Sequence, residues 1–344
     1  MSWTDLFKSK ATTLKPDPRV RWFGKLPTYA DYYTSKADVE WVEEFNDWIL
    51  KGYEIYHGRS RDGTPRSRRM PDSCCVLRLP KSGMTVFAAF QDYGGDNRGR
   101  PFPLCLYVGV PTPHWPGPTH ENLAAAWHIL LALTELRDEV SRFLLRPGRF
   151  ETVFESREID VEGIDEKPPD TSWTTPAATL DLGDWFAAVR DTLEIPVMND
   201  WFRRAAAWGE MVAEHASGEF EPTLRFPMAT AFPIEVQTAG WLRWLGSRMD
   251  LTRHDLSLVV TGGKQDSAGK QNVPGTLTVI AREPTPEDFL LATPAAGGLA
   301  YLDDLSRISN PDAKDDQSPD PTDPEPDIAG SWKAFVEDRL ELPD

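Results

Sequence analysis

The stretch Trp22-Phe-Gly-Lys-Leu-Pro-Thr-Tyr-Ala-Asp-Tyr-Tyr33 places glycine, lysine, proline and aspartate between aromatic residues. Such a segment can be a ligand loop, a catalytic loop or a turn that defines the fold. Lys25 can be an exposed cation, but Leu26, Pro27 and the aromatics favour a rigid turn that packs on a sheet. Asp31 is suited to capping nearby backbone amides. We therefore favour a structural role for this stretch over catalysis or ligand contact.

A second stretch of the same character runs from Asp96 to Leu104, Asp-Asn-Arg-Gly-Arg-Pro-Phe-Pro-Leu. Its arginines could grip an anion, but a strand, not a helix, is predicted to follow it. A turn that returns the chain to the sheet near Phe102 is the better interpretation, since Gly99 permits unusual backbone angles and Pro103 stiffens the entry. Arg100 is expected to pair with Asp31 or Asp96 and so to join the two stretches.

Outward from these stretches, the chain alternates short apolar runs with amphipathic segments. The spacing of the apolar residues, and the turn-forming residues between the runs, predict an α/β fold. We expect a mainly antiparallel sheet of about five strands with helices on its faces. The predicted strands are 74–79, 84–90, 102–110, 256–260 and 275–281. The predicted helices are a segment capped by Asp38, about 119–146, 184–194, 200–216, a short one near 240–249, and a turn capped by Thr285.

Composition narrows the class of partner. The formal charge of −17 predicts repulsion of nucleic acid and of anionic lipid. No apolar run reaches the roughly 18 residues that direct membrane insertion requires. The N-terminus has no continuous apolar segment, and three cysteines without CxxC spacing suit a reducing compartment. These features predict a cytoplasmic protein.

Catalytic signatures are weak throughout. The glycine spacing in the segment 261–271 does not fit a phosphate loop, and the segment is more typical of a hairpin between two strands. The six histidines form neither HxxxH nor HExxH, and no GxSxG elbow is present. Asp31 and Asp96 could form a carboxylate pair, although one sequence does not show that they meet. We expect no enzyme activity, cofactor or metal.

Four regions are expected along the chain. Residues 1–150 form an N-terminal α/β region, and 151–302 complete or extend it. Residues 303–330 are acidic, rich in proline and poor in large apolar groups, which predicts a disordered linker. Residues 331–344 regain helical spacing and predict an amphipathic C-terminal helix.

Two further segments are candidates for partner docking. The loop after the first helix carries a basic cluster that includes Arg66, Arg68 and Arg69. This cluster could grip an acidic partner, stay solvated, or pair with the acidic tail. The C-terminal segment could insert Trp332, Phe335 and Leu340 into a partner's groove or pack back on its own body.

Taken in order, the two glycine–proline stretches resemble those of the TagF/ImpM family of bacterial type VI secretion. The matching residues are Phe23, Gly24, Lys25, Leu26, Pro27 and Asp31 in the first stretch, and Asp96, Gly99, Arg100, Phe102, Pro103 and Leu104 in the second. Ala30 stands where the family has glycine. The resemblance covers residues 20–110 well and 180–295 loosely.

This resemblance implies longin-like (SNARE-like) layers with an extended second half. It also implies a non-enzymatic accessory protein that restrains type VI secretion assembly after translation by binding a forkhead-associated scaffold protein. Two alternatives stay open. One is a structural adaptor that docks through its C-terminal helix, and the other is a hydrolase or phosphatase using Asp31, Asp96 and Arg100.

Overall fold

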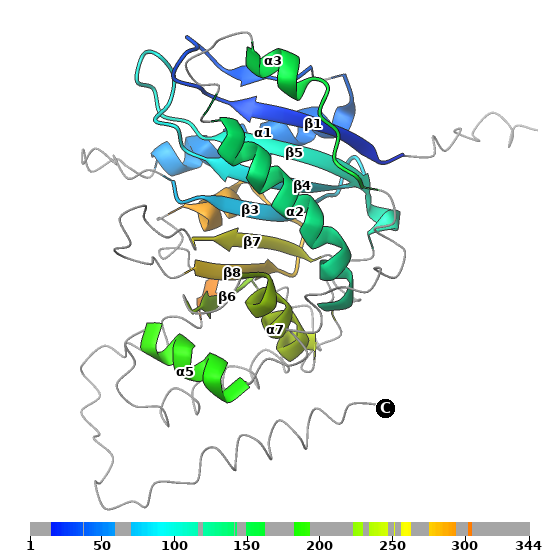
Figure 1. The fold of residues 1–344 in the computed structure, drawn as a ribbon, viewed down its shortest axis with the longest axis vertical. Coiled ribbons are helices and arrows are strands. Elements are labelled where there is room, and N and C mark those ends of the chain that lie inside the picture. Colours follow the sequence, from blue (N-terminus) through cyan, green and yellow to red (C-terminus); the bar gives the residue numbers. More distant parts are fainter. Residues whose placement is uncertain are drawn as a thin grey trace, which may run out of the picture.

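Nine strands form one sheet in the part of the chain that the structure describes (Figure 1). The computed structural model describes residues 15–36, 38–58, 70–115, 120–140, 142, 149–161, 182–192, 223–229, 234–246, 251, 256–262, 275–293 and 302–304. The strands are β1 Asp17–Gly24, β2 Tyr33–Thr34, β3 Ser73–Leu79, β4 Met84–Gln91, β5 Leu104–Pro111, β6 Thr223–Met228, β7 Ser257–Thr261, β8 Gly275–Ile280 and β9 Leu302–Asp304.

The strand order across the sheet is β2-β1-β5-β4-β3-β7-β8-β6-β9. Every neighbouring pair is antiparallel except β6 and β9, which run parallel. The helical segments are α1 Glu40–Gly58, η2 Thr112–His114, α2 His120–Val140, α3 Arg149–Phe154, α5 Leu182–Thr192, α7 Ile234–Gly246 and η4 Pro286–Ala292. The predicted α/β class, with a mainly antiparallel sheet and helices, is confirmed.

Both faces of the sheet are covered, which explains why its central strands β4 and β5 are apolar almost without alternation. In Figure 1, α2 crosses the front face and α1 lies behind the sheet. One core cluster joins that front face to α2, α3 and α7, and a second joins the rear face to α1 and η4. Adjacent Cys74 and Cys75 point to opposite faces, as expected from the strand period, since each packs in a different cluster.

Four strands of the nine were not predicted, namely β1, β2, β6 and β9. Strand β1 carries charged residues at alternate positions, Asp17, Arg19 and Arg21. In the structure these charges satisfy one another, since Arg21 lies 2.9 Å from Asp17 and 2.8 Å from Asp38. Asp38, the expected helix cap, thus forms an ion pair with β1, and α1 begins at Glu40. Charged groups can line a buried strand when each has a partner.

The predicted regions are joined by one sheet. Strand β3 from the first region pairs with β7 from the second in register from Ser73↔Thr261 to Val76↔Leu258. Helix α3 spans the predicted boundary at residue 150. Asp303 and Asp304, assigned to the linker by composition, belong to β9. The expected helix at 200–216, the rest of the linker and the C-terminal helix lie outside the described residues.

Candidate functional site

The two glycine–proline stretches meet at one end of the sheet. Gly24, at the end of β1, adopts φ +150°, and a Cβ there would lie 2.1 Å from the carbonyl oxygen of Pro103. Phe23 packs edge-on against Phe102 with ring centroids 5.6 Å apart. We call the region formed by residues 24–32 and 96–103 the motif corner. The predicted meeting of the two stretches is therefore present in the structure.

A buried carboxylate lies at the centre of the motif corner. The side chain of Asp96 is fully buried, 2.7 Å from Arg100 Nε and 3.5 Å from Lys25 Nζ. The backbone amides of Arg98 and Arg100 donate to its Oδ1 at 2.9 and 3.0 Å. Burial alone would raise the pKa of Asp96, but these amides, the guanidinium and the ammonium lower it to about 2. Asp96 is therefore held ionised.

Arg100 fastens the second stretch to the first. Its Nη2 donates to the carbonyl oxygen of Ala30 at 2.5 Å and lies 3.8 Å from Asp31 Oδ1. A backbone bond of 2.9 Å from the Asn97 amide to the Tyr29 carbonyl adds a second link. Of the two predicted carboxylate partners, Asp96 is the close one and Asp31 is peripheral. Asp31 accepts a bond from the Tyr32 amide, in keeping with its expected capping role.

Lys25 is not the exposed cation that the sequence allowed. Only 6% of its side chain is exposed, and its ammonium lies 4.7 Å from the centroid of the Tyr32 ring. Asp96 compensates the charge, and the face of Tyr32 adds a cation–π contact. Burying Lys25 without such partners would be costly, so its burial depends on the second stretch being in place.

Tyr32 closes the corner on its outer side. Its ring stacks on Phe23 at 5.5 Å and meets Phe102 edge-on at 4.9 Å, yet the residue is 40% exposed. In the part of the chain that the structure describes, Tyr32 and Leu131 are the two exposed large hydrophobic residues. The corner therefore presents a rigid aromatic ring to solvent.

Two residues of α1, Tyr53 and His57, contact the corner and were not singled out from the sequence. Tyr53 donates its hydroxyl to the carbonyl oxygen of Pro101 at 2.7 Å, and His57 Nε2 lies 2.5 Å from that hydroxyl. Burial and the nearby Lys25 charge lower the pKa of His57. Because Tyr53 gives its proton to Pro101, His57 donates to Tyr53. The spacing of four between them fits one helix face, but nothing in that spacing pointed to residue 101.

The remaining candidates either have other roles in the corner or lie outside the described residues. Gly99 takes φ +72° in the turn that presents the Arg98 and Arg100 amides to Asp96, so it serves the turn geometry. Leu26 is buried in the front-face core, while Pro27 is exposed beside it. The docking candidates Arg66, Arg68, Arg69, Trp332, Phe335 and Leu340 lie outside the described residues.

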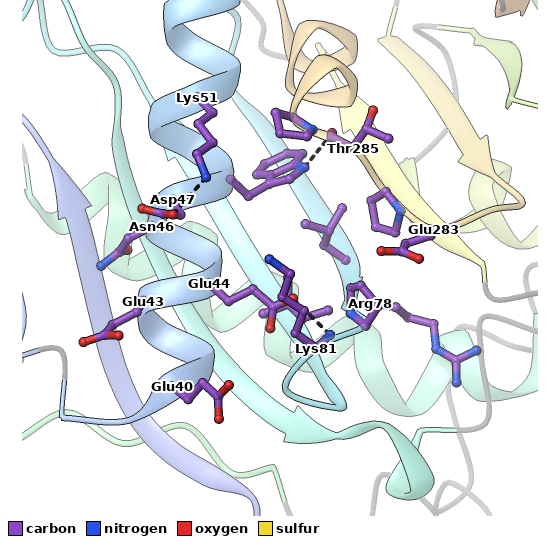
Figure 2. A pocket seen from close by; sticks show the side chains of 16 residues that line it. Glu40, Glu43, Glu44, Asn46, Asp47, Lys51, Arg78, Lys81, Glu283 and Thr285 are labelled. Carbon is purple, nitrogen blue, oxygen red and sulfur yellow. Dashed lines mark hydrogen bonds and ion pairs between the residues drawn. The ribbon is translucent and has the colours of Figure 1, made fainter.

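A separate hollow of about 670 Å³ lies between α1, the β3–β4 turn and the segment before η4 (Figure 2). Figure 2 shows Glu40, Glu43 and Asp47 along one wall and Glu283 on the other. Part of this charge is already matched, since Glu44 accepts the Lys81 and Ser82 amides and Asp47 pairs with Lys51 at 3.1 Å. The lining of this hollow includes none of the motif-corner residues.

The described ranges hold no group of three or more His, Cys, Asp or Glu side chains that could bind a metal ion. Among the helices of those ranges, none combines the length and the apolar character needed to cross a membrane. At the corner, the buried charges are engaged with one another, while Tyr32, Asp31 and Arg98 face outward. Chemically, the arrangement suits recognition by contact more than proton transfer.

Comparison with known proteins gives little more. No protein-family model matches the chain, and no curated protein sequence matches it. Among solved structures, PA0076 from Pseudomonas aeruginosa PAO1 aligns with 79% of this chain and 94% of its own, at 14% sequence identity and a TM-score of 0.33. A likeness at this level carries no functional argument, so the interpretation depends on the motif corner.

Proposed function

We propose that this protein is a non-enzymatic cytoplasmic accessory protein of type VI secretion, and that it restrains assembly after translation by binding a forkhead-associated scaffold protein. The proposal comes from the resemblance of the two stretches to the TagF/ImpM family. The structural observation that supports it is the convergence of the two stretches around Asp96, whose carboxylate lies 3.5 Å from Lys25 Nζ and 2.7 Å from Arg100 Nε. Longin-like layers with an extended second half are part of the same proposal.

The proposed mechanism is sequestration by a preformed surface. Hot spots at protein interfaces are enriched in tyrosine and arginine, and a rigid anchor loses little entropy on binding. Tyr32 is such an anchor because Phe23 and Phe102 fix its ring. An on/off restraint needs no covalent step, only a difference in affinity between two states of the partner.

The electrostatics of the corner support binding over catalysis. A general base works best with a pKa near the working pH, whereas that of Asp96 is lowered to about 2. Its Oδ1 accepts two amides and its Oδ2 faces Arg100 and Lys25. Buried groups paired in this way hold loops in position.

A pull-down and a secretion assay test the proposal together. Tagged full-length protein should recover a forkhead-associated scaffold protein from native cytoplasm, and deletion of the gene should increase secretion. Tyr32→Ala and Arg98→Ala should each weaken recovery about tenfold or more, as expected for interface anchors. The matched control is Arg157→Ala, which removes an exposed arginine just after α3. It should leave recovery unchanged. Unchanged secretion after deletion, with no secretion component recovered, would refute the proposal.

One observation favours a second candidate, phosphoester or ester hydrolysis. Asp31, Asp96 and Arg100 do converge, with Asp31 Oδ1 3.8 Å from Arg100 Nη2 and its side chain 77% exposed. A screen of generic substrates would show turnover by the wild-type protein and its loss in Asp31→Asn. Wild-type protein that turns over none of them would count against this candidate.

A further inference from the structure

A shallow groove of about 390 Å³ lies on the front face of the sheet, between α2 and α7. We call it the α2–α7 groove. Its apolar lining consists of Cys74, Trp127, Leu130, Leu131, Ile234 and Val260. Leu131 is 48% exposed, which makes it, with Tyr32, one of the two exposed large hydrophobic residues in the described ranges. An exposed leucine beside an apolar hollow marks a surface suited to a further apolar group.

The basic group of this groove does not call for an anionic ligand. Arg137 is buried at its end, where its Nη2 lies 3.0 Å from Asp138 and 3.8 Å from Asp72. The guanidinium is thus compensated within the protein. Burial raises the pKa of the Cys74 thiol to about 12, although Arg137 opposes this, so the thiol stays protonated. The groove therefore favours apolar contact over anion binding or thiolate chemistry.

We infer that the occupant of the α2–α7 groove is the chain's own C-terminal segment, residues 331–344. Its sequence, SWKAFVEDRLELPD, places Trp332, Phe335 and Leu340 at helical spacing, which gives one apolar stripe. An amphipathic helix that lays such a stripe in an apolar groove is a recurrent mode of recognition. Leu131 and the stripe would each lose exposed apolar surface in this contact.

The topology brings the segment within reach. β9 ends at Asp304, and β6, β8 and β7 follow it in the sheet, so about 14 Å separates β9 from the strand that carries Val260. As a flexible coil, the 26 residues from 305 to 330 would span roughly 28 Å on average. A tether longer than the gap gives an effective concentration near the millimolar range, which favours this segment over an external one of equal affinity.

Hydrogen exchange on the full-length protein tests the contact from both sides. Phe335→Glu should speed amide exchange in the α2 segment 127–137 by about tenfold or more, without changing α1. Ile328→Glu also replaces an apolar side chain by glutamate in the same tail, but it lies before the segment 331–344, so it should leave α2 as in the wild type. Reciprocally, Leu131→Glu should speed exchange in residues 331–344, whereas Tyr32→Glu, at the other exposed large hydrophobic residue of the described ranges, should not.

Three outcomes would overturn the inference. The first is complete exchange of residues 331–344 within seconds in the wild-type protein, which would mean that the segment is not held. The second is equal behaviour of Phe335→Glu and Ile328→Glu. The third is protection of α2 that rises with protein concentration alongside a doubled mass in light scattering, which would make the occupant the tail of a second copy.

Discussion

At the scale of single residues, Asp96 links the two stretches because its carboxylate is the acceptor shared by Lys25 and Arg100. Its pKa is about 2 in the folded protein, against an ordinary value of 3.8. A carboxyl with a lowered folded pKa stabilises the fold above its unfolded pKa, and this contribution is lost as pH falls toward the folded value. The corner should therefore loosen selectively in acid.

Asp96→Asn tests this pH dependence. The variant should have a lower urea midpoint than the wild type at about pH 6, and the difference should shrink steadily between about pH 4 and about pH 2. Asp31→Asn is the control, because its side chain is 77% exposed and its contact with Arg100 is 3.8 Å. It should track the wild type at every pH. A difference for Asp96→Asn that stays constant down to about pH 2.5 would contradict the assignment.

Gly24 and Gly99 test the shape of the corner. Both have positive φ, but a Cβ on Gly24 would lie 2.1 Å from Pro103 O, whereas a Cβ on Gly99 would meet nothing within 4 Å. Gly99→Ala should cost about 1–2 kcal/mol from backbone strain alone. Gly24→Ala should cost roughly 1–3 kcal/mol more, because backbone must move to make room. Urea unfolding measures both; equal costs would mean that the stretches are not in contact at Gly24.

The sequence predicted the meeting of the stretches but not the burial of Lys25. Glycine and proline restrict the backbone locally, so their turns can be inferred from a few residues. Lysine is almost never buried without a partner, and its partner Asp96 lies 71 positions away in the chain. Sequence reasoning therefore left an exposed Lys25 open and did not predict its burial. The same limit applies to Tyr53, whose bond to Pro101 spans 48 positions.

At the scale of elements, α1 is held to the rear face largely by η4. Trp48 donates its indole N–H to Thr285 O at 2.7 Å, and Gly52 lies against Phe289. The sequence predicted Thr285 as a helix cap. In the structure Thr285 directly precedes η4, and both its amide and its hydroxyl donate to Asp288. Arg282 also pairs with Asp288, at 2.7 Å. The contacts of Trp48 and Gly52 hold η4 close to α1.

Gly52→Ala tests that close approach. A Cβ at Gly52 would lie 2.3 Å from Phe289 Cβ and 2.6 Å from Pro286 O. The overlap should cost about 1–3 kcal/mol and outweigh the better helix propensity of alanine. Gly58→Ala, in the same helix with nothing within 4 Å, should be neutral or slightly stabilising. Urea midpoints compare the two, and a stabilised Gly52→Ala would mean that η4 is not seated on α1.

The strands that the sequence missed have physical reasons in common. Strand β6, TLRFPM, holds Arg225 and Pro227, both of which count against a strand that has neighbours on both sides. Yet Arg225 is buried and bonds to Thr278 and to Leu291 O. The five predicted strands are mostly apolar, and the burial of apolar side chains needs no specific partner. A strand that contains charged residues can be recognised only when the partners of those charges in the fold are known.

At the scale of the whole molecule, one sheet joins both halves of the chain through the β3–β7 pair. The front-face core also runs across this seam, since Phe87 of β4 and Leu277 of β8 belong to the same cluster. A shared sheet and a shared core make separate unfolding of the halves costly, because opening the seam exposes apolar surface on both sides. The described elements should therefore unfold together.

Phe87→Ala and Leu277→Ala test this cooperativity from the two sides of the seam. Each variant removes a fully buried side chain. The free energy of unfolding should fall by about 3–5 kcal/mol for Phe87→Ala and by about 2–5 kcal/mol for Leu277→Ala. If the halves form one unit, each variant shifts a single calorimetric transition to lower temperature, and tryptophan fluorescence and circular dichroism change at the same midpoint. Leu131→Ala, at a half-exposed position of α2, should shift it much less. Two transitions, of which each core variant moves only one, would mean that β3 and β7 join two independent domains.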